Sequence, residues 1–208
     1  MLQPGFFIDN LGLKPHVEGG YYKELYKNSR CLEERPIAST IYYLLKSGQV
    51  SRFHRLKSDE LWLYHYGSPL RIVQLHEDGS LLVPVLGLAV ERGERPQVTV
   101  PAGVIFGAEV VEPDSFCLVS CVVAPGFDPR DFELFAGAEL LRKFPGQVDV
   151  INRFCGEETT RRKQLPHRMR ADIAGAAGHQ HIHRFPPYRQ FFIEFYCSPV
   201  SRPTVFIR

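Results

Sequence analysis

The chain has 208 residues, of which 44% are apolar and 23% are charged, with a formal net charge of +2. This composition fits one globular domain with a real core and excludes a collagen, a coiled coil and a wholly disordered chain; its longest uncharged apolar runs, such as 116–125, are far shorter than the ~20 residues that span a bilayer. The charge is uneven, because residues 155–208 hold nine basic and four acidic residues (+5), whereas residues 1–154 hold 16 basic and 19 acidic residues (−3).

Short stretches rich in Tyr, Val, Ile and Phe follow an irregular or briefly helical lead over residues 1–18. Turn signals separate them every ~8–12 residues, and Asp78-Gly79 in particular predicts a hairpin. In chain order the predicted strands are 20–27, 37–46, 50–55, 61–66, 70–76, 80–86, 97–100, 104–110 and 115–124. This spacing predicts an all-β sandwich or barrel.

One helix is predicted after the last of these strands. Asp128 is suited to cap it and Pro129 to occupy its first position. A mostly apolar face follows, and Pro145-Gly146 ends the helix. The residues of that face are Phe132, Phe135, Leu140 and Phe144.

The basic segment 155–208 differs in character from the domain predicted over residues 1–154. Its composition predicts a poorly ordered C-terminal tail. Within it, His179, His181 and His183 would share one face of a strand. In a flexible tail we interpret them as an adventitious metal site.

The cysteines and the N-terminus bear on the cellular compartment. Five cysteines are an odd number and are widely spread, which is typical of reduced thiols rather than of a disulfide framework. Residues 1–5 show no basic segment followed by an apolar one, so no signal peptide is expected. Together these features predict a cytoplasmic protein.

The segment 51–69 carries the most informative constellation. His54 lies on one predicted strand and Glu60 at the start of the next, so both side chains can point into one barrel. Imidazole nitrogen and carboxylate oxygen suit a divalent metal, and they equally suit a general base and acid without metal. The alternative is a buried His–Glu pair that only holds two strands together.

Several motifs in order resemble the Cupin_5 family of the cupin superfamily. The spacing His54-x-Leu56-x3-Glu60-x6-Gly67 is similar to the first cupin motif, and Pro101-Ala102-Gly103 with Phe106 is similar to the second. Further matching segments are 11–13, 15–22, 39–45, 93–97, 123–127 and 131–134. The resemblance covers roughly residues 8–145. It implies a cupin jelly-roll β-barrel (a double-stranded β-helix), usually paired as a homodimer, with a pocket at the barrel mouth and no particular reaction.

The resemblance also identifies a departure from metal-binding cupins, which use three His and one Glu. Leu56 is at the second His position and Phe106 at the third. His54 and Glu60 alone are fewer ligands than the three that catalytic zinc sites supply. We therefore expect no cofactor; if a divalent metal is bound, His54 and Glu60 are its ligands, and a metal-dependent oxygenase is the less favoured alternative.

Other candidate site residues flank this pair. Tyr42 and Tyr64 are candidate acids that return a proton removed by His54, with Glu60 orienting the imidazole. For the aromatic residues the alternative is barrel filling, and for the glycines after Glu18 it is a turn with positive φ. The candidate ligand-binding residues are Ser51, Trp62, Phe106, Glu18, Tyr22 and Gln97.

These observations predict a cupin-like protein that binds a small polar metabolite in its barrel. By analogy with the sugar-nucleotide epimerases of the cupin superfamily, the first hypothesis is a metal-independent epimerase- or isomerase-like enzyme using His54 and Glu60. A non-catalytic ligand-binding protein and a dimeric scaffold are the alternatives. We expect neither a membrane nor a nucleic acid as partner, because the basic tail lacks an ordered basic stripe with regular aromatics.

Overall fold

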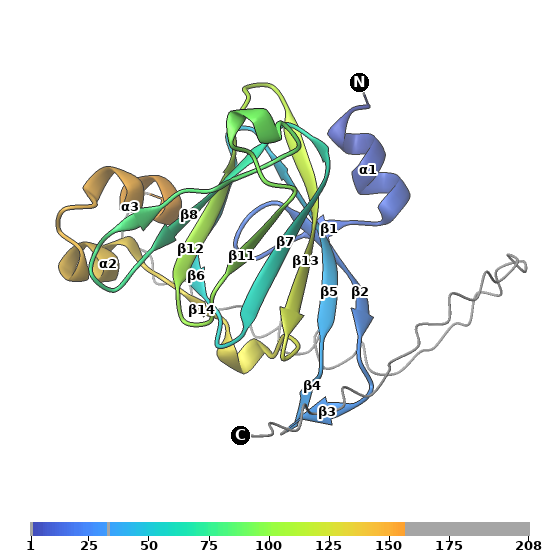
Figure 1. Cartoon of the computed structure of the whole chain (residues 1–208), viewed down its shortest axis with the longest axis horizontal. Coiled ribbons are helices and arrows are strands. Elements are labelled where there is room, and N and C mark those ends of the chain that lie inside the picture. Colours follow the sequence, from blue (N-terminus) through green and yellow to red (C-terminus); the bar gives the residue numbers. More distant parts are fainter. Residues whose placement is uncertain (1, 33, 157–208) are drawn as a thin grey trace, which may run out of the picture. The chain divides into compact units, whose positions relative to one another are not determined.

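The computed structural model describes residues 2–32 and 34–156. This part of the chain is mostly strand (Figure 1). Its helices are α1 (Pro4–Leu11), α2 (Gly137–Lys143) and α3 (Val148–Cys155), with 3-10 turns η1 (Val90–Arg92) and η2 (Pro129–Asp131). Its strands are β1 (Lys14–Pro15), β2 (Tyr21–Lys27), β3 (Cys31–Leu32), β4 (Arg35–Pro36), β5 (Ser39–Lys46), β6 (Val50–Arg55), β7 (Asp59–Gly67), β8 (Leu70–Leu75), β9 (Leu81–Leu82), β10 (Val85–Leu86), β11 (Gln97–Val100), β12 (Ile105–Val110), β13 (Phe116–Ala124) and β14 (Glu133–Leu134).

The strands form two large antiparallel sheets. The first, sheet I, has the order β1-β2-β5-β13-β7-β11. The second, sheet II, has the order β10-β8-β12-β6-β14, with β9 pairing β8. From β5 to β8 and from β10 to β14, strands that are consecutive in sequence alternate between the sheets, which gives the jelly-roll topology and confirms the predicted all-β fold class.

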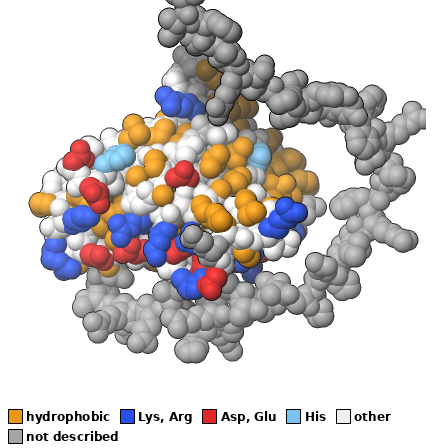
Figure 2. Space-filling model, turned by 60° about the horizontal axis from the view of Figure 1, so that its bottom comes forward, with side chains coloured by type: hydrophobic (Ala, Val, Ile, Leu, Met, Phe, Trp, Pro, Cys, Tyr) orange, Lys and Arg blue, Asp and Glu red, His pale blue; other side chains and the backbone are white. Residues whose placement is uncertain are grey.

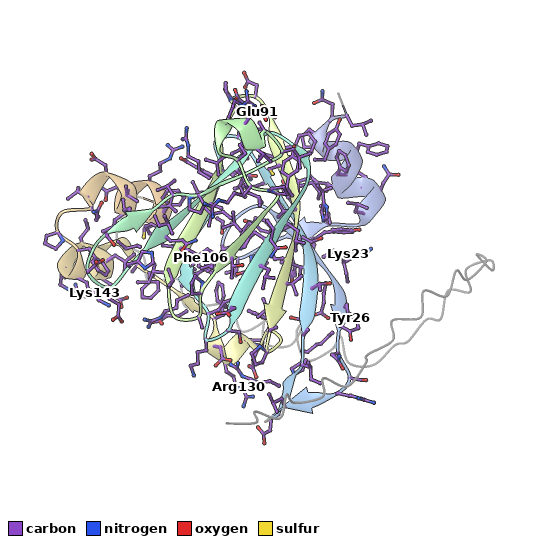
Figure 3. All side chains as sticks on the ribbon, viewed as in Figure 1. Lys23, Tyr26, Glu91, Phe106, Arg130 and Lys143 are labelled. Atoms are coloured by element: carbon purple, nitrogen blue, oxygen red, sulfur yellow. The ribbon has the colours of Figure 1, made fainter. Side chains whose placement is uncertain are left out.

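The main core lies between the two sheets. Sheet I contributes inward side chains such as Tyr43 and Trp62, and sheet II contributes Phe106 and Ile72, all at most 1% exposed. Alternation along each strand sends every second residue inward. Figure 3 shows Phe106 between the ribbons of the two sheets.

The outer faces of the sheets are covered by helices at opposite sides of the molecule (Figure 1). Residues Phe7, Ile8 and Leu11 of α1 pack on the outer face of sheet I. Helices α2 and α3 pack on the outer face of sheet II, where the Phe154 ring stacks on Phe53 at 4.9 Å. Both sheets are therefore buried on two sides over part of their area.

A β-bulge in β6 changes which of its side chains point inward. His54 pairs with Phe106 and Ser51 pairs with Ala108, so three steps on β6 match two steps on β12. The extra residue lets Ser51 and His54 share the inner face, which regular alternation forbids. Gly107 lies opposite the bulge, and a Cβ there would be 2.6 Å from the Ser51 carbonyl oxygen.

The predicted strands are confirmed to within a few residues at their ends, and the stretch 80–86 is divided into β9 and β10. The Asp78-Gly79 hairpin is also confirmed, with Gly79 at φ +83 between β8 and β9. The single helix predicted from Asp128 to Pro145-Gly146 is confirmed only in its second part, where α2 covers Gly137–Lys143. Asp128 caps only the short turn η2, and the chain then forms β14 before α2 begins. Pairing of Glu133 and Leu134 with β6 overrides the helical pattern there.

The predicted tail 155–208 lies almost wholly outside the described residues, as do His179, His181 and His183. Cys155 is the last residue of α3, so the described part of the chain includes the whole of this helix. None of the helices in 2–32 and 34–156 is long and apolar enough to cross a membrane.

Candidate functional site

His54 lies at the centre of a polar cluster between the two sheets, with 3% of its side chain exposed. Its Nδ1 lies 2.7 Å from the Arg52 carbonyl oxygen, and its Nε2 lies 3.3 Å from Glu18 Oε2. A carbonyl oxygen only accepts, so the partners assign a proton to Nδ1. In this tautomer of the neutral ring, Nε2 carries the lone pair and faces the Glu18 carboxyl group.

Glu18 reaches this cluster from the loop before β2. The carboxylate accepts from Ser51 Oγ at 2.9 Å and lies 3.6 Å from His16 Nδ1. Gly19 and Gly20 have φ of +115 and +68, which confirms the turn predicted for these glycines. A Cβ on Gly19 would lie 2.2 Å from the Val50 carbonyl oxygen, so only glycine lets the loop approach β6 this closely.

Glu60 lies on β7 in the opposite sheet and is 6% exposed. Burial raises its pKa to about 8, and the negative charge of Glu18 contributes to the rise, while the Cys121 thiol and the Trp62 indole act in the other direction. Glu60 is therefore a neutral carboxylic acid at pH 7. Burial also raises the pKa of Cys121, so the thiol is not an activated nucleophile.

Two polar atoms beside this acid have no hydrogen-bond partner. They are Glu60 Oε2 and Trp62 Nε1, both buried; Arg52 Nε is the third such atom in the described part of the chain. A buried polar atom without a partner costs about 1–3 kcal/mol. An acceptor and a donor left open on inward positions of β7 are what a bound polar molecule would satisfy.

Aromatic rings enclose the polar groups. The Phe106 ring lies 4.1 Å from the His54 ring, and the Phe132 ring lies 5.4 Å from it. Trp62 meets Phe106 at 6.2 Å and Tyr43 at 5.7 Å, both edge to face. Such walls lower the local dielectric and strengthen each charge interaction inside.

The least buried part of the cluster is where His16, Tyr22 and Phe132 meet. The His16 ring lies 4.5 Å from Tyr22 and 6.4 Å from Phe132, and 17% of its side chain is exposed. Burial lowers the pKa of His16, the carboxylate of Glu18 opposes this, and the charge of His54 adds to the lowering. This part is the natural candidate for the entrance to the interior.

Ion pairs hold the segment that carries Phe132. Asp131 pairs with Arg35 and, at 3.1 Å, with Lys57, while Asp128 binds Arg130. Figure 2, which brings the lower end of Figure 1 forward, shows acidic and basic side chains interspersed along one side of this face and apolar side chains beside them. Arg130 lies at that lower end in Figure 3. The exposed pairs contribute little stability individually, but together they orient the segment.

Most of the predicted site residues lie in this cluster. Ser51, Trp62 and Phe106 are buried within it, Tyr22 is half-buried at its edge, and Glu18 and Glu60 supply its acids. The partner of His54 differs from the predicted one: the Arg52 carbonyl and Glu18 orient the imidazole, rather than Glu60.

Three predicted site residues lie elsewhere. Tyr42 is on the outer face of sheet I, where it packs with the α1 cluster and meets His65. Tyr64 faces inward, but its hydroxyl donates to the Gly67 carbonyl at the far end of β7. Gln97 is exposed, since Val98 and Val100 are the inward residues of β11. Strand alternation excludes Tyr42 and Gln97 from the interior.

Sequence reasoning missed His16, Tyr43, Cys121 and Phe132 as members of the cluster. Tyr43 donates to the Gly19 carbonyl at 2.8 Å and so fixes the loop that carries Glu18. His16 stands two residues before Glu18, and that closeness was the available signal. No comparable signal in the sequence pointed to Phe132, because its position depends on η2 and β14.

The residues present do not fit the ligand set of a metal-binding cupin. Leu56 and Phe106, at the second and third His positions, are core residues exposed by 6% and 1%. Residues 2–32 and 34–156 contain no group of three or more His, Cys, Asp or Glu side chains arranged to hold a metal ion.

A separate hollow of about 240 Å³ lies outside this cluster. It is lined by residues of the 101–105 turn together with Arg55, His76 and Lys143. Its walls share none of the side chains that surround His54. The hollow is therefore not part of the candidate site, which is the polar cluster between the two sheets.

The fold and the site define a jelly-roll protein of the cupin superfamily, with a histidine and two acids buried between its sheets. Residues 6–135 match the Cupin_5 family, described as cupin superfamily (DUF985), and the chain belongs to this family.

Relatives in three organisms support the assignment. The uncharacterized protein YML079W of Saccharomyces cerevisiae is 30% identical over 159 residues, covering 67% of this chain and 78% of that protein. The crystal structure of protein SO0799 from Shewanella oneidensis is 42% identical with a TM-score of 0.73, covering 76% of this chain and 100% of that one. A hypothetical protein from Leishmania major is 38% identical with a TM-score of 0.72, covering 75% and 100%.

Proposed function

We propose that this protein binds a small polar metabolite between its two sheets and moves a proton within it, as a metal-independent isomerase or epimerase. The observation that carries the proposal is the difference between the two buried acids. Glu18 faces two histidines and the Ser51 hydroxyl, whereas Glu60 faces a thiol and an indole and has its pKa raised to about 8. A buried acid that its surroundings keep protonated is suited to donate a proton, opposite a histidine that is paired with a second acid.

The pair of His54 and Glu18 is the proton acceptor in this proposal. The Nδ1–H of His54 donates to the Arg52 carbonyl, so Nε2, which faces Glu18, has the lone pair that can take a proton. When the pair takes a proton from a carbon–hydrogen bond, the electron pair of that bond stays on the ligand, and the positive charge that develops is stabilised inside the aromatic walls by the carboxylate.

Glu60 is the proton donor. It lies on the other sheet, is neutral at pH 7, and presents an oxygen with no other partner. Return of a proton from Glu60 to a different face or atom of the ligand completes an epimerisation or isomerisation, and the ligand's composition is unchanged. The deprotonated Glu60 then recovers a proton from the His54–Glu18 pair or from water.

Exchange of carbon-bound hydrogen in D2O tests this function even while the substrate is unidentified. The protein is incubated with a panel of polar metabolites, and deuterium gain is followed by mass spectrometry. We expect exchange in one compound class, and a loss of at least ~100-fold in His54→Gln and in Glu60→Gln, as general acid–base groups typically supply 10²–10⁴-fold. His65→Gln on the outer face of β7 is the matched control and keeps full exchange.

Ligand binding without exchange would instead identify a non-catalytic binding protein, the alternative that the unpartnered Trp62 indole and Glu60 oxygen also support. Exchange that persists in both variants while they remain folded by circular dichroism would contradict the proposed roles.

A further inference from the structure

We infer that the group of the ligand that enters between Glu60 and Trp62 is an uncharged hydroxyl, so that the site takes a neutral polyhydroxyl compound such as a free sugar or polyol rather than a phosphate or carboxylate. The inference rests on the proposed function only in assigning the ligand to the same interior. It names the chemical class of the ligand, which the fold does not.

The first argument is the pattern of open hydrogen-bonding atoms. Trp62 Nε1 can only donate, and Glu60 Oε2 accepts from a neutral donor or shares the proton of the carboxylic acid. Both atoms are buried and make no close hydrogen bond, and the Trp62 indole is near enough to the Glu60 carboxyl to lower its pKa, so the two groups face the same space. A hydroxyl is the small neutral group that accepts from the indole and donates to the carboxyl oxygen at once.

The second argument is the sign of the charges around that space. The ionisable groups that act on Glu60, Tyr43 and His16 are Glu18, Glu60, His54 and Cys121. In the part of the chain that the structure describes, no lysine or arginine is among them. A phosphate or carboxylate placed here would meet two acids with no permanent cation to offset its desolvation, which is strongly unfavourable.

Arg52 is the residue that can contradict this argument. Its Nε is buried without a hydrogen-bond partner, and its main chain belongs to the cluster, since its N–H donates to the Glu18 carbonyl at 2.8 Å. Arg52 is in the bulge of β6, between the inward Ser51 and the outward Phe53. An anion held by Arg52 is therefore included as an outcome of the test.

The third argument is the shape of the walls. The rings of Phe106 and Trp62 stand edge to face at 6.2 Å beside the polar atoms. Aromatic faces next to a few directed polar groups suit a ring that carries C–H bonds on one face and hydroxyls on its edge.

The single tryptophan of the chain makes the test direct, because Trp62 gives the only indole N–H resonance and the only tryptophan fluorescence. Four probes are titrated into the full chain: myo-inositol and D-glucose as neutral compounds, and D-glucose 6-phosphate and D-glucuronate as anions. We expect a neutral probe to shift the indole resonance and raise the melting temperature. We expect the anions to bind at least tenfold more weakly.

Variants separate this inference from the proposed function. Trp62→Phe, which removes only the donor, is expected to weaken neutral binding about tenfold, as one hydrogen bond is worth about 1–1.5 kcal/mol. Glu60→Gln keeps a donor and an acceptor, so it is expected to retain binding while losing deuterium exchange. Neutral binding without any exchange would refute the proposed function and leave the inference intact.

Three results would overturn the inference. They are tighter binding of an anion that Arg52→Gln abolishes, an indole resonance that no neutral probe moves, and deuterium exchange confined to the anionic compounds. If Trp62→Phe does not fold, the indole resonance of the unmodified chain decides the question alone.

Discussion

Glu60 combines two properties that conflict at the level of a single residue. Its carboxyl is buried with one oxygen unpartnered, which costs stability, and the same burial keeps it protonated, which suits it to donate a proton. Residues selected for function commonly destabilise the fold in this way. The conflict can be measured, because the cost depends on pH.

The folded-state pKa of Glu60, about 8, lies above its ordinary value of 4.5. Well below its ordinary pKa the residue is protonated in both the folded and the unfolded state, and its penalty is absent. As pH rises from 4.5 to 8, the unfolded chain loses the proton first, so stability falls. Glu60→Gln removes this titration, and we expect it to be the more stable protein near pH 8 by about 3–5 kcal/mol.

Urea unfolding at a series of pH values checks this prediction. The gain of Glu60→Gln over the unmodified chain should grow steadily from about pH 5 to about pH 8. Glu24→Gln on the exposed part of β2 is the control and should give no such trend. A gain that is constant with pH would show that Glu60 is ionised in the folded protein.

His16 contributes a pH dependence of the opposite sign. Burial lowers its pKa below the ordinary 6.5, so the unfolded chain binds the proton first as pH falls. The protein therefore loses stability from this residue as pH decreases through and below 6.5. In His16→Gln we expect a shallower fall in melting temperature from about pH 7 to about pH 5, with His76→Gln as the matched control. An unchanged slope in His16→Gln would contradict the prediction.

At the scale of elements, the bulge in β6 is what brings the site together. Ser51 and His54 share the inner face only because one extra residue lies between them, and Glu18 then contacts both. Gly107 is part of this device, since any Cβ there would meet the Ser51 carbonyl at 2.6 Å and the Phe154 ring at 2.7 Å. The neighbouring strand thus needs glycine at this point.

We expect Gly107→Ala to lower the free energy of unfolding by about 2–3 kcal/mol, because overpacking in a well-packed region typically costs about 1–3 kcal/mol and here the obstacle is backbone. It should also weaken deuterium exchange, since His54 moves with the bulge. Gly146→Ala, where an added Cβ meets nothing within 4 Å, is the control. Equal stability of the two variants would mean that β6 and β12 separate without cost.

The contacts around this bulge are the part of the site that could not be predicted from the sequence. Strand positions were predictable because apolar residues and turn signals repeat along the chain, and His54, Ser51 and Phe106 followed from motif positions. The partner of His54 was not predictable, because Glu18 is 36 residues away on a loop whose path depends on Gly19, Gly20 and Tyr43. The sequence predicts Tyr42 as a site residue, whereas Tyr43 is the inward one, because the sequence alone does not say which face of β5 points inward.

At the scale of the whole molecule, the described fold extends beyond the family match, which ends at residue 135. Helices α2 and α3 lie after this point, yet they complete the apolar cluster behind sheet II (Figure 1). The sequence pattern did not predict α3, and it predicted a start for α2 that is too early, because both helices are short and α2 directly follows the strand β14. They also back the strand that carries His54.

A homodimer, which the family resemblance implies, remains a prediction at this scale. Light scattering on the purified chain should give twice the monomer mass of 23.8 kDa. A mass of one chain at micromolar concentration would contradict it. Neither outcome changes the argument for the interior site, because every contact described there lies within one chain.

The contribution of α3 can be tested at one contact, the stack of Phe154 on Phe53 at 4.9 Å. Phe154 is 2% exposed and belongs to the apolar cluster behind sheet II, so Phe154→Ala leaves a buried cavity beside Phe53. Truncations of this kind cost about 3–5 kcal/mol. Val148→Ala at the exposed start of the same helix is the control and should cost little stability.

Phe154→Ala should also affect the site, because Phe53 lies beside His54 in β6. Under conditions in which both variants are fully folded, we expect Phe154→Ala to show less deuterium exchange than Val148→Ala. If exchange per folded molecule is unchanged, α3 stabilises the sheet without positioning the site.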